Sequence, residues 1–219
     1  MNPAQLNQAI RGSLAKVMDH ADELRELDQD LGDGDLGITV SVGAQAVIDA
    51  LDGLDPQAQP VEIARTCAKA FANANPSTLA ALVAGGLLAG SREWDGKSDI
   101  TVADAAAFTK AGGESIAARG KAQLGDKTIL DAIVPAADAL AANTGDAHAA
   151  LAAAIAAADK AVADTKELQS RRGRASWLQE RSIGFQDPGA TAFLRFLQSW
   201  AAANDDAMAD DKAAAGDAS

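Results

Sequence analysis

The feature that most constrains the fold is a helical spacing of apolar side chains in a chain whose commonest residue is alanine. The first such stretch begins at Pro3, a residue that suits the first turn of a helix, and it places Leu6, Ile10, Leu14 and Val17 on one face. Aromatic residues make up only 4% of the chain and β-branched residues are sparse, so strand propensity is low. These properties predict an all-α protein and exclude an all-β fold.

Helix start signals recur along the chain. Ser77 can cap one helix, and Thr101 with Asp104 and Thr128 with Asp131 suggest two capping boxes. The spacing and these caps predict helices at about residues 3–24, 38–54, 60–74, 77–92, 101–119, 128–142, 145–169 and 189–203. Because the connections are short, consecutive helices should be antiparallel, which gives an eight-helix up-and-down bundle or closed barrel.

One stretch, residues 146–168, is rich in alanine. It would let neighbouring helices approach closely, although a high alanine content throughout a proteome would produce the same pattern. The charge balance limits the partners: 31 acidic against 19 basic residues give a net charge of -12, which would repel nucleic acid or an anionic membrane surface. We therefore expect neither as a partner.

No run of apolar residues is long enough to span a bilayer, and the N-terminus lacks a signal-peptide pattern, so we expect a cytoplasmic protein. The single Cys67 cannot form an internal disulfide and has no neighbouring ligand for a soft metal, which favours a place in the core. Residues 1–203 are predicted to form one domain. Residues 204–219 are acidic and small and lack periodic apolar anchors, which predicts a disordered tail.

Four aspartates, Asp28, Asp30, Asp33 and Asp35, occur close together and alternate with glycines. Unpaired, these carboxylates would repel one another and raise each other's pKa, and a divalent cation would remove that repulsion. Ligands that are all carboxylates favour a hard ion over zinc, and the spacing does not fit a calcium EF-hand because Thr39 stands where its last ligand should be a glutamate. Magnesium is the favoured ion. The alternative is a solvated turn between two helices.

Residues 171–190 could bind an anion. They concentrate arginines in an acidic protein and end in Asp-Pro-Gly at a predicted helix start, where free backbone N–H groups add positive potential. We expect Arg174 to contact the anion, and Arg171 and Arg172 to pair with surface carboxylates. Trp177 could cover a base or a sugar, but we expect it to anchor its loop to the body of the protein.

Two other segments carry weaker signals. Residues 119–128 look at first like a Walker A loop, but Asp126 stands where the lysine is required and no strand precedes the segment. Ser77 and Thr78 begin a helix and could face a phosphate, although capping explains them equally well.

Three motifs together resemble the nucleotide-binding L subunit of dihydroxyacetone kinase. They are L-D-x-x-x-G-D-G-D-x-G at 27–37, R-G-K-x-x-x-G-D-K-T-x-L-D at 119–131 and G-R-A-S-W-L-x-E-R-S-I-G-x-Q-D-P-G-A at 173–190. The resemblance covers about residues 5–203 and implies an eight-helix antiparallel barrel. In that family, two Mg²⁺ ions at one end of the barrel bridge the phosphates of ADP or ATP to three aspartates.

The resemblance also implies which residues form the site. By motif position the metal ligands are Asp28, Asp33 and Asp35, and Asp30 is not a ligand. Arg174 is the expected catalytic residue, which would steady the phosphoryl group as it moves. The residues expected beside the nucleotide are Leu36, Gly37, Ile38, Thr39, Ser77, Thr78, Gly120, Ile129, Arg174, Asp187, Pro188 and Gly189.

Three departures from the family pattern concern the nucleotide site. Leu36 and Phe185 occupy positions where most members have histidine, and Asn-Pro-Ser-Thr-Leu at 75–79 replaces a glycine-rich stretch. None of them removes an expected metal ligand. A subfamily that acts on another triose or tetrose sugar would be consistent with them.

The implied activity is phosphoryl transfer to a small keto-sugar such as dihydroxyacetone. The sugar would be held on a separate K-type subunit, because no sugar-binding domain fits within this chain. The donor is either ATP that exchanges at each turnover or a retained ADP that a phosphoenolpyruvate-dependent phosphocarrier protein rephosphorylates, and both remain open. The alternative is a nucleotide-loaded regulatory module that binds a partner protein without turnover of its own.

Overall fold

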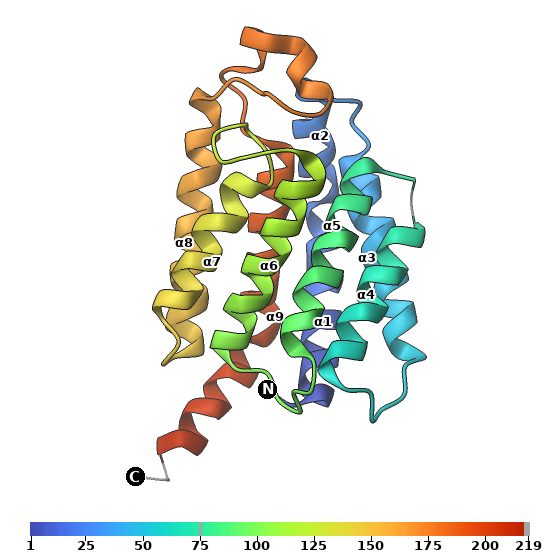
Figure 1. Ribbon diagram of the computed structural model, residues 1–219, viewed down its shortest axis with the longest axis vertical. Helices are drawn as coiled ribbons and strands as arrows, with labels where there is room; N and C mark the ends of the chain where they lie inside the picture. The colour runs from blue at the N-terminus through green and yellow to red at the C-terminus, as the bar shows by residue number, and fades with distance from the viewer. Residues whose placement is uncertain (75, 217–219) are drawn as a thin grey trace.

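The computed structural model describes the backbone of residues 1–74 and 76–216 and the side chains of residues 1–74 and 76–205. Asn75, in the replaced glycine-rich stretch, and residues 217–219 lie outside the described residues. Within them every regular element is helical (Figure 1). The α-helices are α1 (Pro3–Val17), α2 (Ala21–Leu31), α3 (Leu36–Asp52), α4 (Pro60–Ala74), α5 (Thr78–Ser91), α6 (Val102–Gly120), α7 (Leu130–Ala142), α8 (Ala147–Asp164) and α9 (Pro188–Gly216).

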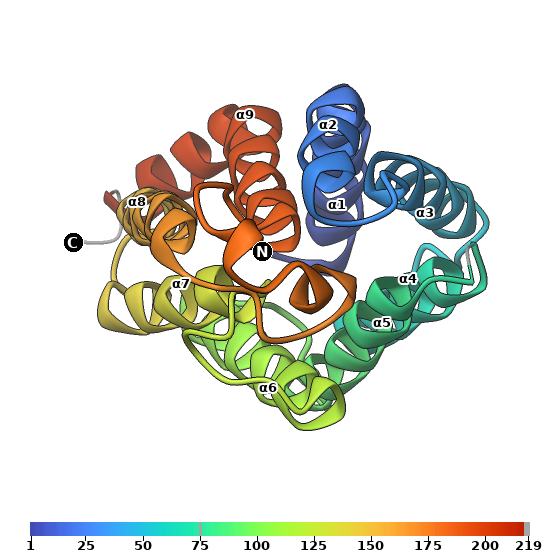
Figure 2. The same ribbon diagram turned by 90° about the horizontal axis from the view of Figure 1, so that it is seen from above.

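The helices form a closed ring in chain order. Each helix from α3 to α9 contacts the one before it, and α9 returns to contact α1 (Figure 2). A short 3₁₀ turn at Met18–His20 is all that separates α1 from α2, so the two occupy one position in the ring. The predicted all-α antiparallel barrel is therefore confirmed.

Fully buried alanines lie among the contacts between α7, α8 and α9. Ala136 in α7, Ala154 and Ala158 in α8, and Ala190 in α9 are all completely buried in one apolar cluster. Such small side chains let helix backbones approach closely, so the alanine-rich stretch has a packing role. A second apolar cluster joins α1, α3 and α4, and it includes Cys67, as predicted.

Glycine permits a similar approach between α5 and α6. A Cβ atom at Gly86 would lie 3.1 Å from the carbonyl oxygen of Gly112, which is tighter than an ordinary contact. The hydroxyl of Ser115 also donates to the carbonyl oxygen of Gly85, 3.1 Å away. These contacts fix how the middle of α5 lies against α6.

The predicted helix boundaries are largely correct, with two differences near the acidic residues. The helix expected at residues 3–24 is interrupted at Met18–His20, and α2 then continues to Leu31. Asp28 and Asp30 therefore lie in the last turns of α2 rather than in a loop, because no glycine or proline occurs between Ala21 and Leu31.

Of the three predicted helix caps, two are present and the third is a different kind of turn. Ser77 caps α5, and Thr101 with Asp104 forms the predicted capping box at α6. At the third site, Asp131 accepts from the backbone N–H of Thr128 at 2.7 Å, but the Thr128 hydroxyl accepts from a different N–H and α7 begins only at residue 130. That pair forms a turn ahead of the helix instead of a capping box.

The C-terminal helix extends beyond the predicted end of the domain. The backbone of α9 is helical to Gly216. Asn204, placed in the tail by the sequence, is buried, and its amide donates to the Ser13 hydroxyl (3.1 Å) and the Trp200 carbonyl oxygen (2.8 Å). The boundary at residue 204 is thus wrong for Asn204, and disorder of the acidic residues beyond it stays a prediction.

Among the described helices, none combines the length and hydrophobicity needed to cross a membrane.

Four connections meet at one end of the ring, at the top of Figure 1. Because successive helices alternate in direction, the α2–α3, α4–α5, α6–α7 and α8–α9 connections all lie there. These connections carry the acidic residues, residues 77–78, residues 119–131 and residues 171–190. The topology therefore gathers all the sequence motifs at the same end of the barrel.

Candidate functional site

Three of the four aspartates converge, and we call them the acidic cluster. Asp28 lies in the last turn of α2, Asp33 lies in the connection and Asp35 immediately precedes α3, yet each offers a carboxylate oxygen within 4.8 Å of the other two. Asp30 is exposed and does not belong to this group. Such a group of carboxylates suits a hard divalent cation.

Local backbone contacts explain this convergence. The backbone N–H of Leu36 donates to Oδ2 of Asp28 at 3.3 Å, which joins the end of α2 to the start of α3. A Cβ atom at Gly37 would overlap the carbonyl oxygen of Ala21, so only glycine lets the first turn of α3 pack this closely on α2. Asp35 stands at the N-terminus of α3, where the helix dipole favours a carboxylate.

Arg174 lies beside the acidic cluster. Its guanidinium forms an ion pair with Asp33. The left-handed Gly173, with φ of 64°, turns the chain into the 3₁₀ segment Arg174–Ser182 that carries this arginine. The guanidinium has five N–H donors in a fixed fork, so it can bind a carboxylate and an adjacent phosphate oxygen at the same time.

The other aromatic and basic residues of this segment differ from expectation. Trp177 is 82% exposed, so it does not anchor the loop to the body of the protein. Arg172 does pair with a carboxylate, at 2.9 Å, but that carboxylate belongs to the buried Asp126 and not to the surface.

The start of α9 is capped from inside the protein. Oδ2 of Asp187 accepts from the backbone N–H of Ala190 at 2.7 Å, and the Asp187 N–H donates to the Thr165 hydroxyl at 2.9 Å. Burial raises the pKa of Asp187 to about 6; the capping N–H groups and Lys127 oppose that shift, and Asp131 adds to it. The N–H groups of this turn already have an acceptor, unlike the free anion-binding groups that the sequence predicted.

The remaining predicted nucleotide contacts all lie at the same end of the barrel. In the first turn of α3, Leu36, Gly37 and Thr39 are buried and Ile38 is 59% exposed. At the start of α5, Ser77 is half-buried and Thr78 is exposed.

Two contacts bring some of these residues together. A Cβ atom at Gly189 would lie 3.5 Å from Cβ of Ile129, so the start of α9, after the buried Pro188, packs against the residue before α7. A Cβ atom at Gly120 would lie 3.7 Å from the Leu82 side chain of α5.

A cleft of about 410 Å³ near the α3–α4 connection, at the other end of the barrel, contains none of the predicted residues.

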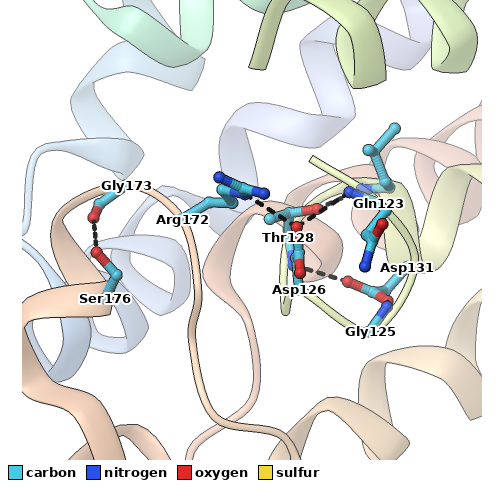
Figure 3. Close-up of polar contacts among 9 residues, drawn as sticks. Gln123, Gly125, Asp126, Thr128, Asp131, Arg172, Gly173 and Ser176 are labelled. Atoms are coloured by element: carbon cyan, nitrogen blue, oxygen red, sulfur yellow. Dashed lines mark hydrogen bonds and ion pairs between the residues drawn. The ribbon is translucent and has the colours of Figure 1, made fainter. Parts of the chain in front are cut away.

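Sequence analysis missed three residues that order this end of the barrel, namely Asp126, Lys127 and Asp131. All three are buried, and Figure 3 shows Asp126 facing Arg172 and Asp131 reaching back to Gly125. Asp131 accepts from the N–H of Gly125 at 2.6 Å. The available signal was the G-D-K-T-x-x-D pattern at 125–131, which belongs to one of the motifs behind the family resemblance and predicts a capping box, but which does not by itself indicate that these three residues are buried.

The fold and the site define a class of protein. The chain belongs to the DAK2 domain family, whose sequence model matches residues 30–202. The family match includes α3 to α8 and the start of α9, and with them most of the residues at the site end of the barrel.

Two relatives show how such a domain is used. The chain is 30% identical over 183 residues to DhaL of Escherichia coli K12, the ADP-binding subunit of a PEP-dependent dihydroxyacetone kinase, with 82% of this chain and 87% of that protein covered. It is 35% identical over 189 residues to L-erythrulose 1-kinase of Mycolicibacterium smegmatis, where the match spans 83% of this chain and only 32% of the relative. The domain thus occurs both as a separate subunit and as a third of a longer kinase.

Comparison with solved structures confirms the fold. The dihydroxyacetone kinase of C. freundii, crystallised with AMP-PNP and Mg²⁺, superposes with a TM-score of 0.72 at 21% sequence identity. The matched region covers 92% of this chain and 34% of that protein.

Proposed function

We propose that this chain binds ADP or ATP with Mg²⁺ and acts in phosphoryl transfer as the nucleotide-binding subunit of a dihydroxyacetone-type kinase. The observation that carries the proposal is the convergence of Asp28, Asp33 and Asp35 beside the guanidinium of Arg174. The relatives support it, since one is named an ADP-binding subunit and the structural neighbour holds AMP-PNP and Mg²⁺.

The donor set of the acidic cluster fits magnesium. All three donors are carboxylates, and no histidine or cysteine belongs to the group among the described residues. Magnesium in nucleotide sites usually binds one or two carboxylates plus phosphate oxygens, so three carboxylates can serve the two ions that the family resemblance implies. The bound ions supply positive charge against the phosphate oxygens.

The chain's own groups would position the nucleotide. Arg174 donates to the phosphoryl group that is transferred and so acts as the catalytic residue. The hydroxyls of Ser77 and Thr78 contact phosphate oxygens at the start of α5. Ile129, packed against Gly189, offers apolar surface to the nucleoside. Leu36 to Thr39, Gly120 and the turn at 187–189 complete the proposed contacts.

The acceptor sugar would come from another polypeptide. The match covers 87% of the E. coli relative, which is named a subunit, but only 32% of the L-erythrulose 1-kinase and 34% of the C. freundii kinase. We propose that a K-type subunit holds a triose or tetrose keto-sugar and presents it to the acidic cluster. The E. coli relative is named PEP-dependent, which supports a phosphoenolpyruvate-dependent phosphocarrier protein as one of the two phosphoryl sources, beside ATP.

Calorimetry tests the binding site. The wild-type chain should bind ADP only with Mg²⁺ present, and saturation at about 100 times the dissociation constant should add about 2.7 kcal/mol to the free energy of unfolding. Asp33→Asn should abolish the Mg²⁺-dependent binding, while the matched control Asp30→Asn should retain it. Equal losses in both variants would contradict the assignment of the acidic cluster, as would an unchanged melting temperature.

A turnover assay tests the reaction. The purified chain is mixed with a K-type subunit, dihydroxyacetone or erythrulose, Mg²⁺ and ATP, with no phosphocarrier protein. Sugar phosphate formed under these conditions identifies ATP as the exchanging donor. Turnover only when phosphoenolpyruvate and its carrier proteins are added identifies a retained ADP. Nucleotide binding without turnover in either mixture would favour a regulatory module.

A further inference from the structure

A buried lysine lies beneath the segment that carries Arg174. Lys127 is 2% exposed and adopts a left-handed backbone conformation with φ of 60°. Its ammonium donates to the carbonyl oxygens of Leu168 (3.1 Å) and Ser182 (2.5 Å). Burial lowers the pKa of Lys127, and the carboxylate of Asp187 opposes that shift. An ammonium is costly to bury, so its place here calls for a structural reason.

The two acceptors of Lys127 flank residues 169–181, which we call the arginine segment. One ammonium thus joins the two ends of a segment that spans Arg171, Arg172 and Arg174. The same ends are also joined directly, because the backbone N–H of Ser170 donates to the hydroxyl of Ser182 at 2.9 Å.

The neighbouring Asp126 fastens the first part of the arginine segment. Its backbone carbonyl oxygen accepts from the N–H of Arg171 at 3.0 Å, and its side chain pairs with Nε of Arg172 at 2.9 Å (Figure 3). Burial opposes ionisation of Asp126, but hydrogen bonds from Arg172 and the Gln123 N–H outweigh it and lower the pKa of Asp126. Residues 126 and 127 therefore hold the base of the segment from the α6–α7 connection.

The outer part of the arginine segment is far more open than its base. Arg174 and Trp177 are exposed, while Ser170 and Ser182 at the base are buried. Within the outer part, the Ser176 hydroxyl donates to the Gly173 carbonyl oxygen at 2.7 Å. Closing the base of a loop reduces the conformations open to its tip, so the contacts at the base lower the entropic cost of holding Arg174 beside Asp33.

We propose that Lys127 is a positioning residue: it closes the base of the arginine segment and so holds Arg174 at the acidic cluster. This inference rests on the proposed function, because the ligand that Arg174 would contact is the nucleotide phosphate. Lys127 itself donates to backbone carbonyl groups inside the protein and has no role in contacting the ligand.

A double-mutant cycle on Lys127 and Arg174 tests this, with the affinity for ADP in excess Mg²⁺ measured by calorimetry. Arg174→Ala should weaken binding by about tenfold or more, as expected for the loss of a charge-assisted hydrogen bond. Lys127→Met should weaken binding about tenfold in the wild-type background and less than about twofold in the Arg174→Ala background, because the two residues act through one contact. The matched control Lys166→Met removes an exposed lysine close in sequence to Leu168 and should leave the affinity unchanged.

Hydrogen exchange provides the second readout. Lys127→Met should increase amide exchange in the arginine segment and leave α8 unchanged. If this variant does not fold, Ser182→Ala opens the same base by removing the acceptor of the Ser170 N–H, and it enters the same cycle with Arg174→Ala.

Each outcome decides a different claim. Equal losses from Lys127→Met in both backgrounds would show that Lys127 acts independently of Arg174, by its charge or through the α9 cap, and would overturn the inference. An unchanged affinity in Lys127→Met would overturn it too, and so would an unchanged affinity in Ser182→Ala when hydrogen exchange shows that the base of the arginine segment has opened. Failure of the wild-type chain to bind ADP with Mg²⁺ would instead overturn the proposed function.

Discussion

Asp187, the buried residue that caps α9, should make the protein less stable above pH 6 than a variant with an uncharged cap. Asp187 caps the helix from a position where burial raises its pKa to about 6 from an ordinary value of 3.8. Between these values the folded state holds a proton on Asp187 that the unfolded state has lost. Stability contributed by this residue is therefore greatest at low pH and declines as the pH rises toward 6.

The size of the effect follows from the shift. A change of about two pKa units corresponds to about 3 kcal/mol once the group is ionised in both states. Linkage gives about 2 kcal/mol at pH 5 and about 3 kcal/mol at pH 8. Asparagine caps helices about as well as aspartate and carries no charge. Asp187→Asn should therefore raise the free energy of unfolding by up to about these amounts.

Urea unfolding of the variant and the wild type at pH 5, 6, 7 and 8 measures the difference. Other titrating groups cancel in that difference, which should grow up to about pH 6 and then level off. Asp146→Asn is the matched control, because Asp146 caps α8 through the N–H of Ala149 but is only half-buried. This control shows what the same substitution does at a cap that is not fully buried.

Two results would refute this reasoning. A destabilisation of the Asp187→Asn variant that is constant from pH 5 to 8 would mean that the carboxylate is fully ionised in the folded protein and stabilised by Lys127. A stabilisation that does not vary with pH would mean that the gain comes from the amide and not from relief of a buried charge.

Three further variants test two close packing contacts and one ion pair. Gly37→Ala should destabilise the protein by about 1–3 kcal/mol in urea unfolding and weaken Mg²⁺-dependent ADP binding, because the methyl group displaces α3 from α2. Ala154→Leu should cost a similar amount and leave the affinity unchanged, since Ala154 is fully buried between α7, α8 and α9; no loss would contradict the close packing there. Arg195→Met removes a two-bond pair with Glu23 and should cost about 1 kcal/mol or less. Arg195 lowers the pKa of Glu23, so this loss should disappear as the pH falls below 4.5 through the lowered value, which unfolding at several pH values would show.

The fold was accessible from sequence because its determinants are local. Apolar spacing, the cap at Ser77 and the capping box at Thr101 each fix a helix without reference to the rest of the chain. Short connections then leave only antiparallel neighbours. The break at Met18–His20 was not predictable in this way, because no glycine or proline marks it.

The candidate site was only partly accessible. The convergence of Asp28, Asp33 and Asp35 agrees with the expected ligand set, although the ligand assignment itself stays a prediction. The contacts of Lys127 and Asp126 with the arginine segment could not be read from the sequence, since they join residues about 40 to 55 positions apart. Trp177 was misjudged because an aromatic residue in a loop is usually buried, and here it is exposed.

The closed ring has a consequence for how the protein matures. The acidic cluster lies where α2 meets α3, and Arg174 lies in the connection that precedes α9. The ring is complete only when α9 packs against α1. A nascent chain that lacks its final helix cannot yet bring the two halves of the site together. Under the proposed function, the nucleotide should therefore bind only after α9 has packed against α1, and the ligand would select molecules whose ring is closed.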